Sequence, residues 1–178
     1  AYYYEENGLG RAISQEEALD KLRIGMAAGL VLQPSNSRRA GWICCCCGCC
    51  CGVLRTLRQA PQPARLVASP FMAAMDAEKC NGCTICTRRC QTNAFTETAA
   101  GIRLDPERCI GCGLCVSTCP TGALQLCRKP RRDQPAVPAN VAASMLRLAW
   151  KRRQTGPAAL LRMVAASQRD RLRARSRP

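Results

Sequence analysis

The hydrophobic and polar positions of residues 12–33 predict a helix followed by a strand. Ser14 and Glu17 have the spacing of a capping box at the start of the helix, and Gly29 is expected to end it. The apolar residues 30–32 then predict a short strand. The apolar positions of the helix, four residues apart, are Ala18, Leu22 and Met26.

Residues 41–58 form a cysteine-rich block that neither helical nor strand periodicity describes. Seven of the eight residues 44–51 are cysteine, and residues 53–58 predict a short helix. The three prolines of residues 60–70 predict a linker.

Residues 71–129 contain an internal repeat with an offset of 29 residues. The run DAEKCNGCTIC at 76–86 aligns with DPERCIGCGLC at 105–115. Residues 95–104 alternate around a turn at 98–101, which predicts a hairpin, and residues 124–126 predict a closing strand. Beyond residue 129, prolines indicate a second linker, and two basic helices are expected at 140–153 and 157–175.

The amino-acid composition excludes several classes of catalytic and metal site. The 178 residues include 16 Cys and no His, which excludes Ser/His/Asp and Cys/His catalysis, Rieske centres and Cys2His2 zinc fingers. Two Phe, two Trp and three Tyr are too few for an ordinary aromatic core, so we expect cysteine ligation to supply much of the order.

Eight of the cysteines stand in two copies of the pattern Cys-x2-Cys-x2-Cys-x3-Cys, which is typical of iron–sulfur sites. The first three cysteines of a copy come from one tight loop, and the fourth, expected at the start of a short helix, binds the other cluster. Pro120 is expected at the first position of the helix that follows its copy. The crossed assignment gives cluster I the ligands Cys80, Cys83, Cys86 and Cys119, and cluster II the ligands Cys109, Cys112, Cys115 and Cys90.

Two structural zinc sites and disulfides are the alternatives for these cysteines. Zinc sites usually take pairs of CxxC elements, and no export signal is visible, so a disulfide scaffold is the weaker interpretation. We therefore expect a cytoplasmic protein. Because the chain lacks an initiator Met, we expect it to be the C-terminal part of a longer one.

Residues 71–127 resemble the bacterial-type two-cluster ferredoxin domain. The resemblance implies a pseudo-twofold βαββαβ fold around two [4Fe–4S] clusters that act as a one-electron relay. Residues 3–138 more broadly resemble the C-terminal portion of a group of bacterial 4Fe–4S dicluster-domain proteins, on residues 6–11, 28–31 and 43–54. That group usually has Asn at the place of Cys45, so Cys45 is left out of the candidate ligands.

The cysteine block is a candidate third site, for another iron–sulfur cluster or for zinc. Adjacent cysteines cannot all face one metal, because alternate residues of a strand point to opposite sides. Redox-active thiols and a lipidated patch are the alternatives, and Cys127 is expected to be inert. The candidate ligands are Cys44, Cys46, Cys47, Cys49, Cys50 and Cys51.

The net charge of +15 is concentrated in the tail. Residues 128–178 carry fourteen Lys and Arg against two Asp. We expect a solvated and partly disordered tail. The alternatives are that it binds nucleic acid, an acidic membrane surface or an acidic redox partner, although it has no nucleic-acid motif and no segment long enough to span a bilayer. We expect Arg88 and Arg89, beside the first cysteine run, to be solvated.

Together these features predict an α+β protein in five segments. They are an N-terminal helix and strand segment (1–40), the cysteine block (41–58), a linker (59–70), the ferredoxin domain (71–129) and a basic helical tail (130–178). The predicted function is electron transfer, as a ferredoxin-like protein or as part of a larger oxidoreductase. The alternative is an oxidoreductase subunit whose cysteine block is a third metal or redox-thiol site. A stand-alone enzyme is the less favoured of these interpretations.

Overall fold

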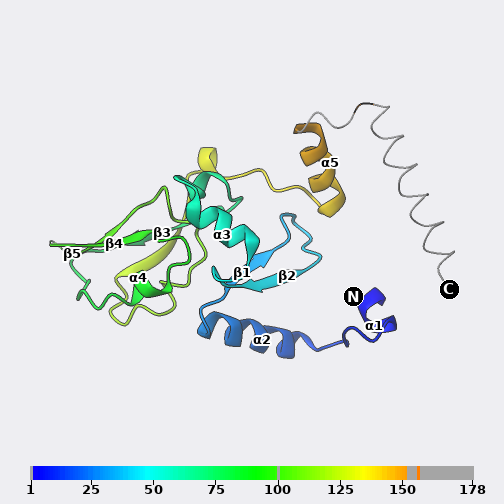
Figure 1. Ribbon diagram of the computed structural model, residues 1–178, viewed down its shortest axis with the longest axis horizontal. Coiled ribbons are helices and arrows are strands. Elements are labelled where there is room, and N and C mark those ends of the chain that lie inside the picture. The colour runs from blue at the N-terminus through cyan, green and yellow to red at the C-terminus, as the bar shows by residue number, and fades with distance from the viewer. Residues whose placement is uncertain (1, 100, 152–155, 157–178) are drawn as a thin grey trace. The chain divides into compact units, whose positions relative to one another are not determined.

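The computed structural model describes residues 2–99, 101–151 and 156. Its contacts divide the chain into two units. The first comprises residues 1–34 and 42–136, and the second comprises residues 35–41 and 137–178. Figure 1 labels the helices and strands. All sixteen cysteines lie in the first unit, so this unit positions the candidate sites.

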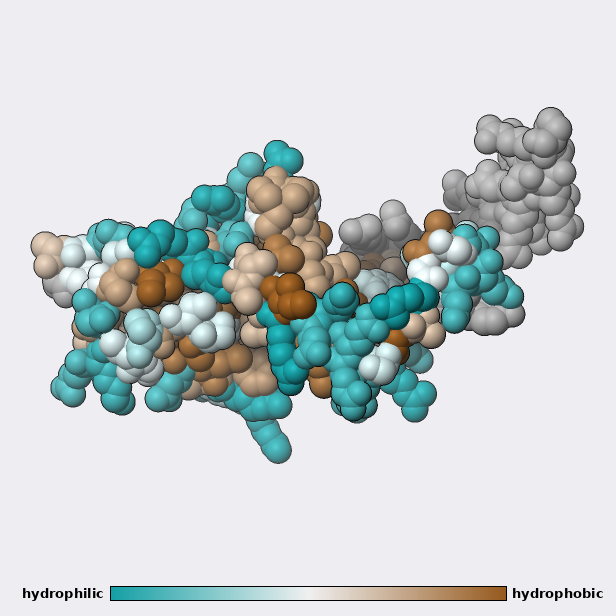
Figure 2. All heavy atoms as spheres, turned by 90° about the horizontal axis from the view of Figure 1, so that it is seen from below, coloured by the Kyte–Doolittle hydropathy of each residue, from teal (hydrophilic) through white to brown (hydrophobic). Residues whose placement is uncertain are grey.

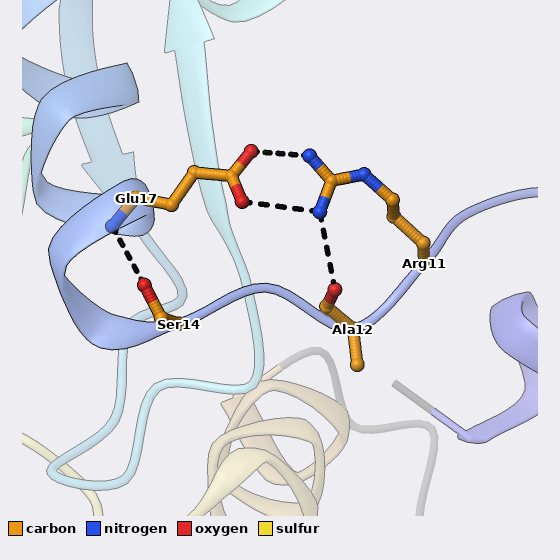
Figure 3. Close-up of polar contacts among 4 residues, drawn as sticks. All are labelled: Arg11, Ala12, Ser14 and Glu17. Atoms are coloured by element: carbon orange, nitrogen blue, oxygen red, sulfur yellow. Dashed lines mark hydrogen bonds and ion pairs between the residues drawn. The ribbon is translucent and has the colours of Figure 1, made fainter.

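The first unit begins with two helices, α1 (Tyr2–Glu6) and α2 (Gln15–Ala27). Ser14 caps α2 as predicted, because its Oγ accepts a hydrogen bond of 3.1 Å from the Glu17 amide (Figure 3). The Glu17 carboxylate pairs with the Arg11 guanidinium (Figure 3). Gly29 follows the helix with a φ of +86°, a conformation that suits glycine, and so ends it where expected.

A small hairpin and a helix come next. Strand β1 (Val31–Pro34) pairs antiparallel with β2 (Ile43–Cys46), and Val31 lies opposite Cys46. Helix α3 (Gly52–Gln59) confirms the short helix predicted after the cysteines. Its buried side chains Leu54 and Leu57 pack with Val31, Ile110 and the fully covered Leu114, which joins the cysteine block to the second copy of the repeat.

The repeat forms β3 (Phe71–Met75), α4 (Ile85–Arg89), β4 (Phe95–Thr98), β5 (Gly101–Leu104) and β6 (Leu124–Arg128). Within the described residues, β4 pairs with β5 as the predicted hairpin, and the closing strand β6 pairs with β3, each antiparallel. Met75 lies opposite Leu124, so the two ends of the repeat are joined. The result is a small mixed α/β unit with short sheets, compatible with a ferredoxin-like domain.

Two local expectations for this unit were wrong. Cys90 is the residue that follows α4 and lies at its C-terminal end, so the fourth cysteine does not start a helix. In the second copy, residues 114–118 form consecutive turns, and Pro120 lies in a turn that leads directly into β6. The fourth cysteine therefore follows a helix in the first copy and a series of turns in the second.

The core of the first unit is modest. Its second cluster of buried side chains contains Ala73, Phe95 and Leu124 together with the thiols Cys109 and Cys115. Figure 2 shows hydrophobic patches scattered among hydrophilic residues on the face that it presents. Exposed apolar residues include Trp42, Val53 and Leu66. Such a small core fits a domain whose order depends on ligation.

The second unit contains α5 (Val141–Lys151), which confirms a basic helix in the region 140–153. The amides of Arg38 and Arg39 donate to the carbonyl oxygens of Pro138 and Ala139, at 2.8 and 3.3 Å. The helix expected at 157–175 lies outside the described residues. In the part of the chain that the structure describes, no helix is both long enough and apolar enough to cross a bilayer.

Candidate metal centre

One cavity gathers cysteines from both copies of the repeat. Its walls include Cys80, Cys83 and Cys86 of the first copy and Cys119 of the second, together with the apolar side chains Ile85, Ile102 and Leu124. Residues 81–84 form the loop before α4, while Cys119 reaches the cavity because the β3–β6 pairing brings the end of the second copy beside the start of the first. The cavity thus has four thiols and an apolar lining.

A second group of thiols contains Cys90 of the first copy and three cysteines of the second. Burial raises the pKa of Cys115 to about 12, and the nearby thiols of Cys112, Cys109 and Cys90 add to the rise. Burial also raises the pKa of Cys112, with contributions from Cys90 and Cys109. These four groups therefore lie close enough for their charges to interact, in a poorly solvated place that favours binding to a cation over free thiolates.

Backbone amides point at two of these sulfurs. The Ala73 amide donates to Cys109 Sγ at 3.3 Å, and the Ala94 amide donates to Cys90 Sγ at 3.2 Å. Burial raises the pKa of Cys119, but the Thr121 side chain and amide act in the opposite direction, and the net pKa shift is downward. Such N–H···S contacts stabilise bound thiolates and tune the potential of iron–sulfur sites.

The spread of these thiols fits a cluster better than a single ion. Four thiolates bound to one zinc at about 2.3 Å hold their sulfurs about 3.8 Å apart. Among the described residues, no three of the eight repeat cysteines have sulfurs all within 4.8 Å of one another. A cubane binds each thiolate through a different iron and so needs a wider set.

The loops that carry the first three cysteines of each copy need left-handed backbone. Gly82 and Gly111, at equivalent places in the repeat, have φ values of +74° and +68°. Thr84 (φ +59°) and Gly113 (φ +78°) form a second equivalent pair. The left-handed backbone at Thr84 was not predicted, although the alignment of Thr84 with Gly113 in the repeat was a usable signal.

Comparison with known families supports the same chemistry. Residues 102–125 match the family model of the 4Fe–4S binding domain, and the match includes Cys109, Cys112, Cys115 and Cys119. The match covers 24 of the 178 residues, and this part of the chain is similar to a 4Fe–4S binding domain. No curated protein matches the chain. The domain indicates iron–sulfur electron transfer, in a chain with a further cysteine-rich region upstream.

Arg108 holds the 4Fe–4S binding domain to its surroundings, a role that the sequence did not reveal. Its Nε donates to the Thr92 carbonyl oxygen at 2.9 Å, and its two terminal nitrogens donate to the carbonyl oxygens of Ala60 and Arg58 at 3.1 and 2.8 Å. Ala60, which was expected to lie in a linker, is therefore hydrogen-bonded to Arg108, the residue that precedes Cys109. Lys79, the equivalent residue of the first copy, pairs with Asp76 instead.

Arg89 and Gln91 flank Cys90 and bind the N-terminal segment. The Arg89 guanidinium donates to the Met26 and Ala27 carbonyl oxygens at 2.7 and 2.9 Å, at the C-terminal end of α2. The expectation that Arg89 is solvated was wrong, because these carbonyls and the helix dipole attract its charge. Gln91 donates to the Gly29 carbonyl oxygen at 3.2 Å and accepts from the Gly48 amide at 2.8 Å.

The cysteine block is divided between different surroundings. Cys46 and Cys51 pack against the core that contains Leu54 and Leu114. Cys47, Cys49 and Cys50 instead form a separate thiol group beside them in sequence. The side chains of Cys49 and Cys50 lower the pKa of Cys47 to about 6, and the contacts with Cys47 and Cys49 raise the pKa of Cys50. All sixteen cysteines lie in the described residues, and none of them forms a disulfide.

Proposed function

We propose that this chain transfers electrons through two [4Fe–4S] clusters, as a ferredoxin-like protein or as the electron-transfer part of a larger oxidoreductase. The observation that carries the proposal is the position of Cys119, which lines one cavity with Cys80, Cys83 and Cys86. A fourth thiol from the opposite copy is what a pair of interlocked cluster sites requires.

The proposed ligands follow the crossed assignment. Cluster I takes Cys80, Cys83, Cys86 and Cys119, and cluster II takes Cys109, Cys112, Cys115 and Cys90. The shared cavity supports the first set, and the mutual effect of the four thiols on their pKa values supports the second. The 4Fe–4S family match covers three ligands of one set and one of the other.

The strand pairing supports a pseudo-twofold βαββαβ arrangement for residues 71–129. The outer strands β3 and β6 pair, and the inner strands β4 and β5 pair. The turns at 114–118 stand where α4 stands in the first copy. This arrangement places each fourth cysteine near the opposite loop.

When bound, the clusters supply one-electron redox chemistry. The cysteine thiolates hold the iron, and Ile85, Ile102 and Leu124 keep water from the first set. The amides of Ala73 and Ala94 stabilise negative charge on Cys109 and Cys90. All-cysteine ligation in such surroundings gives an expected potential on the order of −400 mV.

Paired substitutions and an iron count test the ligand sets. Under the crossed assignment, Cys90→Ser with Cys112→Ser removes two ligands of the same cluster, so about four irons per chain remain of about eight. Cys119→Ser with Cys112→Ser removes one ligand from each cluster, and both are expected to be lost. Iron and acid-labile sulfide are measured after anaerobic purification, with EPR of the reduced protein.

Cys127→Ser is the control, because Cys127 is exposed in β6 and belongs to neither set. It should retain about eight irons and the EPR signature of two coupled clusters. The reverse iron pattern in the two double variants would show that each copy binds its own cluster. A single cluster in the unsubstituted chain would refute the two-cluster proposal.

A second candidate is an oxidoreductase subunit with a third metal or redox-thiol site in the cysteine block. The convergence of Cys47, Cys49 and Cys50 favours it. In either case we propose a protein partner that exchanges electrons with the chain and has an acidic surface to which the basic tail docks. We also propose a reducing compartment such as the cytoplasm, in which thiols stay free to bind iron.

A further inference from the structure

The cysteine block is separated into sets by the local backbone. In β2, Cys45 lies against α2, since a Cβ at Gly25 would be 3.4 Å from Cys45 Sγ. Cys46 and Cys51 pack on the core, and Gln33 Nε2 lies 3.9 Å from Cys51 Sγ. Strand alternation and burial thus leave residues 47–50 as a distinct turn.

Three thiols converge in that turn. Cys50 Sγ lies 3.1 Å from Cys47 Sγ and 3.3 Å from Cys49 Sγ, and all three sulfurs lie within 4.8 Å of one another. Thiolates on one zinc ion lie about 3.8 Å apart, so a small adjustment lets all three bind one ion. Among the described residues, this is the only group of three or more cysteine or carboxylate side chains that is so close.

The turn is held from both sides. The Cys51 amide donates to the Cys47 carbonyl oxygen at 3.2 Å, and Cys51 leads directly into α3. The Gly48 amide donates to Gln91 Oε1 at 2.8 Å. A Cβ at residue 48 would lie only 2.8 Å from that same oxygen, so glycine allows Gln91 to approach the turn closely. The three thiols are therefore presented by an ordered backbone.

We propose that Cys47, Cys49 and Cys50 bind a single thiophilic metal ion of the Zn²⁺ or Cu⁺ class, at a mononuclear site distinct from the two cluster sites. Thiolates select these soft ions over Mg²⁺ or Ca²⁺. Cys49 and Cys50 are exposed and Cys47 is half-buried, so the ion keeps a position accessible to solvent or to a ligand from a partner. This narrows the six candidate ligands of the block to three.

Metal-dependent thiol protection tests the site in the full chain. The anaerobically purified, reduced protein is titrated separately with Zn²⁺ and with Cu⁺, then alkylated, and each modified cysteine is located by mass spectrometry. One bound ion per chain should protect Cys47, Cys49 and Cys50 together. Cys49→Ser and Cys50→Ser should each weaken binding at least tenfold, because a three-ligand site loses a third of its donors.

Cys44→Ser is the matched control, since Cys44 is an exposed cysteine of the same block outside the trio. It should bind the ion as the unsubstituted chain does. The proposal is overturned if Cys50→Ser binds the metal unchanged, if the metal protects Cys46 and Cys51 equally, or if the trio forms a disulfide instead. About four additional irons per chain, lost in Cys49→Ser, would also overturn it by showing a third cluster.

The iron of the two clusters is counted in the same samples. A chain that lacks those clusters but shows protection of the trio would refute electron transfer through two clusters and leave the mononuclear site standing. A chain with about eight irons in which the metal does not protect the trio would refute the mononuclear site and leave the two-cluster proposal standing.

Discussion

Gly82 and Gly111 occupy equivalent places in the two copies of the repeat but have different neighbours. A Cβ at Gly82 would meet nothing within 4 Å. A Cβ at Gly111 would overlap the Phe71 carbonyl group and lie 2.7 Å from Ser69 Oγ. Only the loop of the second copy is packed against the start of β3, so only Gly111 is needed for close backbone approach as well as for its φ angle.

Alanine substitutions at these two glycines should therefore differ. Both place an alanine in left-handed backbone at a cost of about 1–2 kcal/mol. Gly111→Ala adds an overlap with backbone that cannot move freely, worth about 1–3 kcal/mol more. We expect cluster absorbance to bleach in urea roughly 5- to 150-fold faster in Gly111→Ala than in Gly82→Ala, if the added strain acts fully on unfolding. Equal bleaching rates would show that β3 does not constrain this loop.

At the residue scale, the spacing of the cysteines was sufficient to predict the chemistry, and the family match at residues 102–125 supports it. The left-handed Thr84 was not predicted, because a β-branched residue rarely adopts that conformation. The division of residues 44–51 was also beyond the sequence. Identical side chains carry no periodicity, and only β2 and the following turn separate Cys46 from Cys47.

Between elements, Arg89 is the main polar contact from α4 to α2. Its guanidinium binds two carbonyl oxygens at the end of α2, while its neighbour Arg88 contacts Thr84 within its own turn, at 3.4 Å. A hydrogen bond to a charged group contributes about 1.5–3 kcal/mol to stability. The segment 15–34 therefore depends on a residue adjacent to a proposed cluster ligand.

Replacing Arg89 should make the amides of α2 exchange faster without loss of iron from the clusters. Arg89→Ala is expected to increase amide hydrogen exchange of residues 15–34 by at least tenfold, since about 1.4 kcal/mol corresponds to a factor of ten. Arg88→Ala, which removes the same charge at the adjacent position, should leave that exchange unchanged. Iron content is measured in both variants. Unaltered exchange in Arg89→Ala would mean that apolar packing alone holds the helix.

The elements show where sequence patterns are informative. Capping at Ser14, the glycine stop and the hairpin at 95–104 follow from local chemistry and were confirmed. The turns at 114–118 were not foreseen. There Ser117 Oγ and Thr118 Oγ1 donate to the Leu114 carbonyl oxygen at 3.1 and 3.0 Å, and this competes with helical hydrogen bonding. The β1–β2 pairing was hidden because β2 is mostly cysteine.

For the whole molecule, the charge is separated from the proposed clusters along the chain. Residues 130–178 hold twelve of the 27 Lys and Arg but only two of the 12 Asp and Glu, so their removal lowers the formal charge from +15 to +5. The pairing of β3 with β6 ends at Arg128, and the Lys129 amide donates to the Pro70 carbonyl oxygen at 2.9 Å. The pairing of the outer strands of the repeat is therefore complete before residue 130.

Truncation after Lys129 should then alter electron exchange with charged partners while the iron content stays at about eight per chain. A field from the basic residues attracts anionic acceptors and weakens with salt, because the Debye length is only about 8 Å at 0.15 M ionic strength. Oxidation of the reduced full chain by ferricyanide should slow as salt rises, whereas oxidation by a cationic hexaammine complex should accelerate. In the truncated chain both dependences should become several-fold weaker. Stopped-flow bleaching of the clusters measures these rates. Identical salt dependence in the two chains would mean that the field of the tail does not act at the site of electron exchange. That result would exclude the tail from docking an acidic partner.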